Sequence, residues 1–394
     1  MTEIKQQYRR PLQGNKPTHL TIEIEYQDGT KNKVDYVHAM IPERYGTNPH
    51  QLFTLLVPAD YDFRVESVKS GKGGFSLTNI EDSFWAAELL KYMDEPTCVV
   101  MKHENPCGAA VSDDLEKAFM RAWYCDFVSA FGGVVGFNKP VTKELAQLMV
   151  EKSNDKTKYF IEVVAAPEYE QGAMAELDKR PDLRALLYKG LESMPKYDGD
   201  MAAPVIKAQG GIDGMLSFED RFLSRIRKPD DFLAKEYTRS NGEKLTGLGV
   251  VTERAPTGKE LSDLRFAWYA AAVLRSNATA IVKDGVLISP GTGKQARVYS
   301  VVDSIRKIDD FNTAAVKQDI AFERNKIFDY STKGSVLASE ALFPEPDSVD
   351  AIAPRDIKAV AQTGGSIKDK ESIEAANKYG IAMVLTGERT FSHH

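Results

Sequence analysis

The sequence is poor in cysteine and has no long apolar run. Its three cysteines, Cys98, Cys107 and Cys125, form neither a C-x-x-C pair nor the spacing of a zinc site. Such an odd and sparse set is typical of the reducing cytosol and argues against a disulfide framework. No stretch approaches the roughly 18 apolar residues of a membrane-spanning helix, and the start at Met1 lacks the apolar core of a signal peptide. We therefore expect a cytoplasmic protein with no membrane partner.

The sequence also lacks a block of charge of one sign. It has 51 Lys and Arg against 57 Asp and Glu, and this net charge of -6 is spread along the chain. Because nucleic-acid binding relies on a basic patch, we expect no nucleic-acid partner and only a local phosphate site. The sequence offers no cluster of metal ligands, so we expect no metal in the chemistry. Its 42% hydrophobic residues and 394 positions suit a globular enzyme of two or three core-bearing units.

Strand and helix patterns alternate along the chain, which predicts an α/β fold. Alternating residues at 19–26 followed by Asp28-Gly29 predict a strand that leads into a hairpin. Buried strands are expected at 98–101, 163–166, 278–283, 286–289, 357–362 and 381–386, and helices at 83–93, 113–123, 259–276 and 371–379. We expect Asp82 or Ser83 to cap the first helix. No short internal repeat is visible. We expect three parts: a leader at 1–37, a first subdomain at 38–237 and a second at 238–394.

The pair Lys102-His103 follows a predicted buried strand and precedes a polar, turn-forming segment that ends at Gly108. Loops at strand ends are where α/β sheets place their ligands. A histidine can accept a proton near neutral pH, and a neighbouring lysine can stabilise a developing negative charge. Taken alone, a Lys-His pair is more often an ordinary solvated loop.

Glycine clusters and two arginines are further candidates for ligand contact. The clusters at 131–133, 291–293 and 363–366 could each bring backbone N–H groups close to a ligand. None matches a phosphate loop or a dinucleotide fingerprint, and singly each is more often a tight turn. Arg44 and Arg389 could bind phosphate through their guanidinium forks, although a lone arginine is usually a surface charge.

Several segments together resemble the transformylase domain of the bifunctional purine biosynthesis protein that also carries IMP cyclohydrolase. They are Glu43–Gln51, Lys102–Ala110, Ser129–Gly133, Arg275–Ala278, Gly291–Val298, Gly364–Asp369 and Arg389–His394. These segments occur in the order of the family, and the resemblance covers nearly everything after His38. Their joint occurrence makes the resemblance specific, where each segment alone would be weak.

The resemblance implies a fold, an activity and partners. The implied fold is α/β, with duplicated cytidine-deaminase-like three-layer units whose mixed sheets are flanked by helices. The implied enzyme is an AICAR formyltransferase, which transfers formyl from 10-formyltetrahydrofolate to the AICAR amine and gives FAICAR in de novo purine (IMP) biosynthesis. The resemblance also implies a homodimer with active sites shared between protomers. A structural K+ ion, which some relatives hold, is a further expectation.

The resemblance also assigns roles to residues of this sequence. His103 would be the general base and Lys102 would stabilise the oxyanion, with Asn277 completing the catalytic set. The nucleotide would be bound by Arg44, Tyr45, Phe131, Gly132, Glu162, Arg389 and Phe391. The folate would be bound by Arg297, Phe343, Pro344, Asp347, Thr363 and Gly364.

The sequence departs from the family in three places. The cyclohydrolase domain that normally precedes Arg44 is replaced by a short leader, so we expect no IMP cyclohydrolase activity and a separate protein that supplies it. The family's F-F-P-F-R-D stretch stands here as Leu342–Asp347, which leaves open a formyltransferase or deaminase acting on a different nucleotide. The segment 173–237 matches poorly.

Two other classes of function remain as alternatives. A zinc-dependent deaminase is disfavoured because the H-x-E and P-C-x-x-C pattern is absent. A regulatory protein that binds nucleotide or folate without turnover would need the arginines but not the base. The presence of Lys102 and His103 therefore favours an enzyme.

Overall fold

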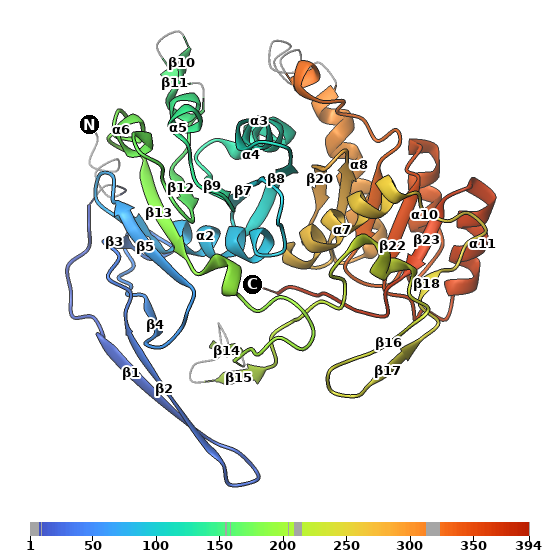
Figure 1. Cartoon of the computed structure of the whole chain (residues 1–394), viewed down its shortest axis with the longest axis horizontal. Coiled ribbons are helices and arrows are strands. Elements are labelled where there is room, and N and C mark those ends of the chain that lie inside the picture. Colours follow the sequence, from blue (N-terminus) through green and yellow to red (C-terminus); the bar gives the residue numbers. More distant parts are fainter. Residues whose placement is uncertain are drawn as a thin grey trace. The chain divides into compact units, whose positions relative to one another are not determined.

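The computed structural model describes residue 8 and residues 10–153, 156–157, 159–203, 205–208, 215–312 and 324–393. The chain divides into two compact units, Met1–Met194 and Pro195–His394; Figure 1 labels helices and strands of both. Within the described part of the chain, none of the helices combines the length and apolarity needed to cross a bilayer.

Six strands of the first unit lie in one sheet. Their order is β8 (Asn105–Val111), β7 (Thr97–Lys102), β9 (Val134–Phe137), β12 (Val163–Ala166), β13 (Arg184–Lys189) and β5 (Arg64–Lys69). Strands β9, β12 and β13 are parallel, whereas β7 is antiparallel to both of its neighbours and β5 is antiparallel to β13. All residues of β9 and β12 are buried. Both faces of these strands are therefore covered, as expected for parallel strands.

The helices of the first unit are α2 (Leu77–Leu90), α3 (Leu115–Cys125), α4 (Phe127–Ala130), α5 (Lys143–Val150) and α6 (Ala173–Leu177), with a 3₁₀ turn at Leu191–Ser193. Helix α2 packs against β7 and β9. It begins six residues before the predicted start at 83, because Ser76 and Asn79 form a capping box at its N-terminus. The predicted caps, Asp82 and Ser83, lie inside the helix.

The predicted hairpin of the leader is confirmed. Strands β1 (His19–Glu25) and β2 (Lys31–His38) are antiparallel, and β2 also pairs with β4 (Leu56–Pro58). Short pairs complete the first unit: β3 (Glu43–Tyr45) with β6 (Phe75–Ser76), and β10 (Lys152–Ser153) with β11 (Lys156–Thr157).

The sheet of the second unit repeats the topology of the first. Its order is β20 (Val286–Gly291), β19 (Thr279–Lys283), β21 (Val336–Ser339), β22 (Ala359–Gln362), β23 (Ala382–Leu385) and β18 (Gly249–Val250). Here β19 is antiparallel to both neighbours, β21 to β23 are parallel, and β18 is antiparallel to β23. Strand order and direction therefore match strand by strand, although the sequence shows no repeat.

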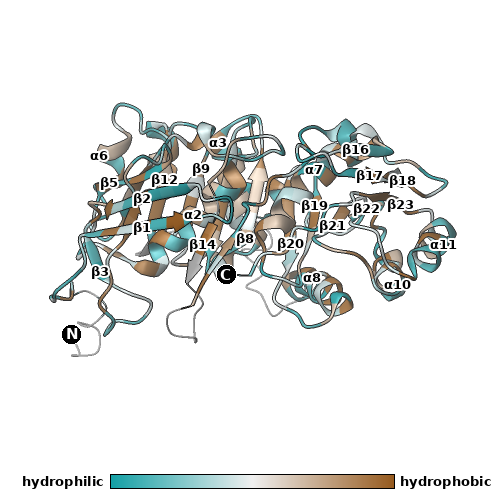
Figure 2. Cartoon of the chain, turned by 90° about the horizontal axis from the view of Figure 1, so that it is seen from below, coloured by the Kyte–Doolittle hydropathy of each residue, from teal (hydrophilic) through white to brown (hydrophobic). Residues whose placement is uncertain are grey.

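The helices of the second unit are α7 (Gly258–Val273), α8 (Arg297–Asn312), α10 (Asp347–Ile352) and α11 (Asp369–Tyr379), with 3₁₀ turns at Pro229–Leu233 and Ala353–Arg355. Figure 2 shows hydrophobic and hydrophilic residues together on α8 and α11. On α8 the buried residues include Val301, Ile305 and Ile308, so this helix is amphipathic. Two hairpins complete the unit: β14 (Val205–Ala208) with β15 (Leu216–Glu219), and β16 (Glu236–Thr238) with β17 (Lys244–Thr246).

The division between the units falls after Met194, whereas the sequence placed a boundary at 237/238. The intervening segment makes buried contacts with the second unit. The hydroxyl of Tyr269 on α7 donates to the carbonyl of Ile226 at 2.7 Å, and Arg225 Nε donates to the carbonyl of Thr386 at 2.7 Å. Phe232 is fully buried. These contacts explain why a segment with an irregular sequence belongs to the second unit.

Candidate functional site

The pair Lys102-His103 lies at a tight hairpin turn rather than in an open loop. Strand β7 ends at Lys102 and β8 begins at Asn105, so His103 and Glu104 are the two turn residues, with φ of 54° and 61°. Positive φ at both positions is the signature of a type I′ turn. The His103 side chain is exposed. A general base must reach its substrate, and this position allows that.

The segment after the turn was predicted as a loop but is part of a strand. Strand β8 runs through Pro106, although proline cannot donate to a strand ladder. Its register with β7 shifts between Val100 and Met101, beside the pairing of Met101 with Pro106. Such irregularities are where strands accommodate proline.

A buried carboxylate of α2 holds this turn. Asp82 Oδ1 accepts a hydrogen bond from the backbone N–H of Glu104 at 2.6 Å. Burial raises the pKa of Asp82 to about 6, against the opposing effects of the Glu104 N–H and the charge of His103. Burial, followed by the charges of Glu104 and Asp82, raises the pKa of Glu81 to about 7. The sequence analysis had considered Asp82 only as a helix cap.

Lys102 connects the turn to a pair of exposed aromatic rings. Its Nζ donates to the carbonyl of Phe131 at 2.6 Å. The Phe131 ring stacks on Phe160 with a centroid distance of 4.5 Å and an interplanar angle of 20°. These side chains are 59% and 40% exposed, and the Gly132 N–H donates to the carbonyl of Phe160 at 2.7 Å. The structure thus brings Lys102, Phe131 and Gly132 together, and it adds Phe160, which the sequence analysis missed.

Arg44 and Glu162 also lie together, and Arg184 joins them. Glu162 Oε1 accepts from Arg44 Nη2 and from Arg184 Nη1, each at 3.2 Å. The Arg44 guanidinium lies over the Tyr45 ring, 4.6 Å from its centroid. Burial and the charge of Arg44 lower the pKa of Arg184. The Glu162 N–H donates to the carbonyl of Gly133 at 3.1 Å, which connects this cluster to the Phe131 segment. Sequence gave no signal for Arg184, since an isolated arginine is uninformative.

In the second unit, Asn277 is held by Arg297. Arg297 Nη2 donates to Asn277 Oδ1 at 2.8 Å, and Arg297 Nη1 donates to the carbonyl of Ala278 at 2.8 Å and to Glu340 Oε1 at 3.0 Å. Asn277 Nδ2 donates to the carbonyl of Lys294 at 2.8 Å, and the peptide between Ser276 and Asn277 is cis. Arg297 is buried in this network. Its contacts orient Asn277.

The predicted folate-binding segments meet at one glutamine. Gln362 Oε1 accepts from the N–H groups of Phe343 at 3.3 Å and Gly364 at 2.9 Å. The Phe343 ring is fully buried, so it cannot present its face to a ligand in this structure. Pro344 is exposed, whereas Asp347, Thr363 and Gly364 are half-buried.

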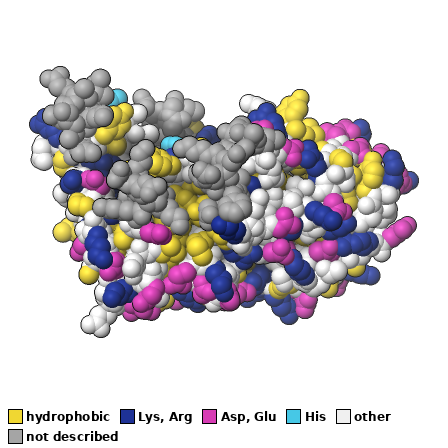
Figure 3. Space-filling model, turned by 90° about the horizontal axis from the view of Figure 1, so that it is seen from above, with side chains coloured by type: hydrophobic (Ala, Val, Ile, Leu, Met, Phe, Trp, Pro, Cys, Tyr) yellow, Lys and Arg dark blue, Asp and Glu magenta, His cyan; other side chains and the backbone are white. Residues whose placement is uncertain are grey.

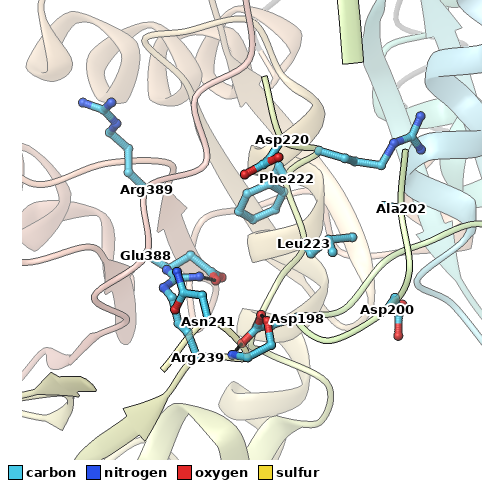
Figure 4. Close-up of a pocket in the computed structure, with 12 residues that line it drawn as sticks. Asp198, Asp200, Ala202, Asp220, Phe222, Leu223, Arg239, Asn241, Glu388 and Arg389 are labelled. Atoms are coloured by element: carbon cyan, nitrogen blue, oxygen red, sulfur yellow. Dashed lines mark hydrogen bonds and ion pairs between the residues drawn. The ribbon is translucent and has the colours of Figure 1, made fainter. Parts of the chain in front are cut away.

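Arg389 and Phe391 lie together near the C-terminus. The exposed Arg389 guanidinium lies over the Phe391 ring, 4.5 Å from its centroid. Arg389 lines a pocket of about 370 Å³ in the second unit, and Figure 4 shows its side chain pointing away from Asp198 and Arg239. Glu388 beside it is buried, accepts from the Arg225 N–H at 3.0 Å, and has a pKa raised by that burial.

The surface charge agrees with a local rather than a broad anion site. Among the residues coloured by type in Figure 3, basic and acidic side chains are interspersed on the face shown. The described residues include no group of three or more His, Cys, Asp or Glu that could hold a metal ion.

Comparison with known proteins identifies the family to which the chain belongs. A family model described as AICARFT/IMPCHase bienzyme matches residues 18–307. The bifunctional purine biosynthesis protein PurH of Caldicellulosiruptor saccharolyticus is 36% identical over 378 residues, which cover 94% of this chain and 63% of the relative. PurH of Persephonella marina is 37% identical over 355 residues, and PurH of Aquifex aeolicus is 36% identical over 352, each alignment covering 89% of this chain and 59% of the relative. The chain spans about three fifths of the length of these relatives. The resemblance seen in the sequence is confirmed, and the chain belongs to the AICARFT/IMPCHase bienzyme family.

Proposed function

We propose that this chain is an AICAR formyltransferase that transfers formyl from 10-formyltetrahydrofolate to the AICAR amine in purine biosynthesis. Membership of the AICARFT/IMPCHase family supports the reaction class. The observation that carries the proposal is the exposed imidazole of His103, which stands on a fixed turn beside Lys102 and the Phe131 segment. A protein that only bound nucleotide would need no base at this place.

The reaction needs a base because the acceptor is a poor nucleophile. The lone pair of the AICAR amine is delocalised into the imidazole ring and carboxamide. As the amine nitrogen forms its bond to the formyl carbon, His103 takes the amine proton, and the formyl oxygen becomes an oxyanion. Collapse of this intermediate breaks the bond to N10 of the folate, which takes a proton back as tetrahydrofolate leaves. General base assistance of this kind is worth roughly 10²–10⁴-fold.

Lys102 and the stacked phenylalanines support this chemistry. The Lys102 ammonium donates to the carbonyl of Phe131, and as the cation that precedes the turn it is assigned to stabilise the oxyanion. The exposed, stacked rings of Phe131 and Phe160 offer an apolar face to a planar heterocycle. Binding both substrates together then contributes by proximity.

We assign the nucleotide phosphate to Arg44, with Arg184 beside it. The Nε of Arg44 is buried and makes no hydrogen bond to any described residue, so this guanidinium retains donor capacity. A phosphate dianion would compete with Glu162 for the two arginines, which frees the carboxylate for the ribose hydroxyls. In the second unit we assign Arg389 and Phe391 to the nucleotide.

We assign the folate to the segments around Asn277 and Gln362. Asn277 and Arg297 are assigned together, since Arg297 is held by Glu340 and in turn orients the Asn277 amide. Gln362 joins the two predicted folate segments, which contain Pro344, Asp347, Thr363 and Gly364. Phe343 supports these segments from the core. We also propose that the two units are a duplicated cytidine-deaminase-like fold, which their matching strand order supports. The homodimer remains a prediction, which light scattering of the purified protein would test.

Absorbance of released tetrahydrofolate tests the activity directly. The assay compares the wild-type chain, His103→Ala, and His19→Ala as a control at another exposed histidine of the first unit. We expect turnover in the wild type and control, and a loss of about 10²-fold or more in His103→Ala. Calorimetry should show that His103→Ala keeps its affinity for AICAR. If the wild type binds AICAR and folate without releasing tetrahydrofolate, the chain is a binding protein and the proposal fails.

A further inference from the structure

In each unit, a buried aspartate on a helix accepts hydrogen bonds from the backbone of a hairpin turn. In the first unit, Asp82 is the sixth residue of α2 and accepts from the N–H of Glu104 at 2.6 Å. In the second unit, Asp263 is the sixth residue of α7 and accepts from the N–H groups of Asp284 at 3.1 Å and Gly285 at 2.8 Å. Both carboxylates are buried. Each one binds the turn of the hairpin that follows its helix.

The two turns share a conformation but differ in sequence. All four turn residues have positive φ: 54° and 61° at His103 and Glu104, and 51° and 71° at Asp284 and Gly285. The Asp-Gly sequence is well suited to this turn, whereas the His-Glu sequence is not, because side chains with a Cβ disfavour the left-handed region. The turn that bears the imidazole is therefore the one that depends more on support from outside it.

The surroundings of the two carboxylates also differ. Asp263 forms an ion pair with Lys259 at 3.1 Å. Among the described residues, no lysine or arginine forms an ion pair with Asp82. The charged groups near Asp82 are Glu81 on its own helix and His103 and Glu104 on the turn. The principal polar contacts of Asp82 are thus with the turn itself.

We propose that Asp82 is a positioning residue for His103, a role that rests on the proposed function. Its carboxylate fixes the backbone N–H of Glu104 and thereby holds the exposed imidazole in the orientation in which it meets the acceptor amine. Asp263 is the structural counterpart, which holds a turn without a catalytic group. Removal of Asp82 misplaces the base, and removal of Asp263 only loosens the fold.

Matched substitutions separate positioning from stability. Asp82→Ala removes the acceptor, Asp82→Asn keeps one side-chain oxygen that can accept, and Asp263→Ala removes the counterpart. We expect Asp82→Ala to lower kcat about 10²-fold, the scale of a misplacement of about 1 Å, with KM for AICAR nearly unchanged. Asp82→Asn should recover most of this loss. Asp263→Ala should lower the urea midpoint and leave kcat within about twofold of the wild type, because the turn that it holds carries no group assigned to the chemistry.

A double variant shows whether Asp82 acts through His103. If it does, Asp82→Ala combined with His103→Ala is no slower than His103→Ala alone. Equal losses of kcat in Asp82→Ala and Asp263→Ala would overturn the positioning role, as would a wild-type kcat in Asp82→Ala. A wild-type kcat in His103→Ala would remove His103 as the base and thereby overturn the role of Asp82, whereas the absence of turnover in the wild type would overturn the proposed function itself. If Asp82→Ala does not fold, Asp82→Leu and Asp263→Leu, which also remove the acceptor but keep the side-chain volume, are compared by the same criteria.

Discussion

Glu162 neutralises two buried guanidinium groups, so its removal should have a measurable cost. In Glu162→Gln, Arg44 and Arg184 keep their hydrogen bonds to backbone carbonyls but lose the charge that both share at 3.2 Å. The two arginine side chains are 6% and 5% exposed, whereas that of Glu162 is 31% exposed. Breaking a buried pair typically costs roughly 3–5 kcal/mol. Because water reaches part of Glu162, we expect Glu162→Gln to lower the free energy of unfolding by less than this, about 2 kcal/mol.

Urea unfolding measures this loss because urea is uncharged and does not screen the ion pairs, whereas guanidinium chloride is a salt and would screen them. A lower midpoint at an unchanged slope gives the change in the free energy of unfolding. Glu66→Gln is the matched control, because Glu66 forms only a largely exposed pair with Lys189 at 3.6 Å. Pairs of that kind contribute roughly 0–1 kcal/mol.

Phosphate provides the decisive comparison. The two arginines in Glu162→Gln lack their carboxylate, so inorganic phosphate should raise the midpoint of this variant more than that of the wild type. Chloride at the same ionic strength should not reproduce the effect. An unchanged midpoint in Glu162→Gln would refute the electrostatic reasoning. Equal stabilisation of variant and wild type by phosphate would place the anion site away from Arg44 and Arg184.

Two further predictions follow from burial and from packing. The pKa of Asp82 is raised from 3.8 to about 6, so the folded state binds the Asp82 proton more tightly than the unfolded state does. The stability that this proton contributes is lost as pH rises from about 4 to about 6. Urea midpoints should therefore fall less across this pH range in Asp82→Asn than in the wild type. Gly108→Ala places a Cβ 2.1 Å from the carbonyl oxygen of Ala122 and should destabilise the protein by about 3 kcal/mol, whereas Gly258→Ala, which meets no atom within 4 Å, should leave the thermal midpoint unchanged or slightly higher.

Apolar runs made much of the fold predictable. The strand at 163–166 was predicted with its observed bounds, and the predicted helix at 259–276 lies close to α7 at Gly258–Val273. These segments owe their structure to burial, which the local pattern reflects. The start of α2 was missed because its first turn is polar and is fixed by the cap at Ser76.

The site was predictable only where a motif carried it. Lys102 and His103 stood out through their neighbours in the sequence, whereas Asp82, Phe160 and Arg184 act through contacts with residues distant along the chain. The hydrogen bond between Asp82 and Glu104 spans 22 positions, and Arg184 also binds the carbonyl of Gly74, 110 positions away. No local pattern encodes such contacts. No internal repeat was visible for the same reason, since the common topology of the two units depends on strand pairing and not on residue identity; a duplication was expected only through the family resemblance.

The order of the strands along the chain has a consequence for biosynthesis. The first sheet draws all six of its strands from residues 64–189, and the second draws its six from residues 249–385. A ribosome that has released the first 194 residues has already released every strand of the first sheet. Domains generally fold as units, N-terminal first, during translation. The nascent chain can therefore assemble the sheet that carries His103 while the other is still being translated.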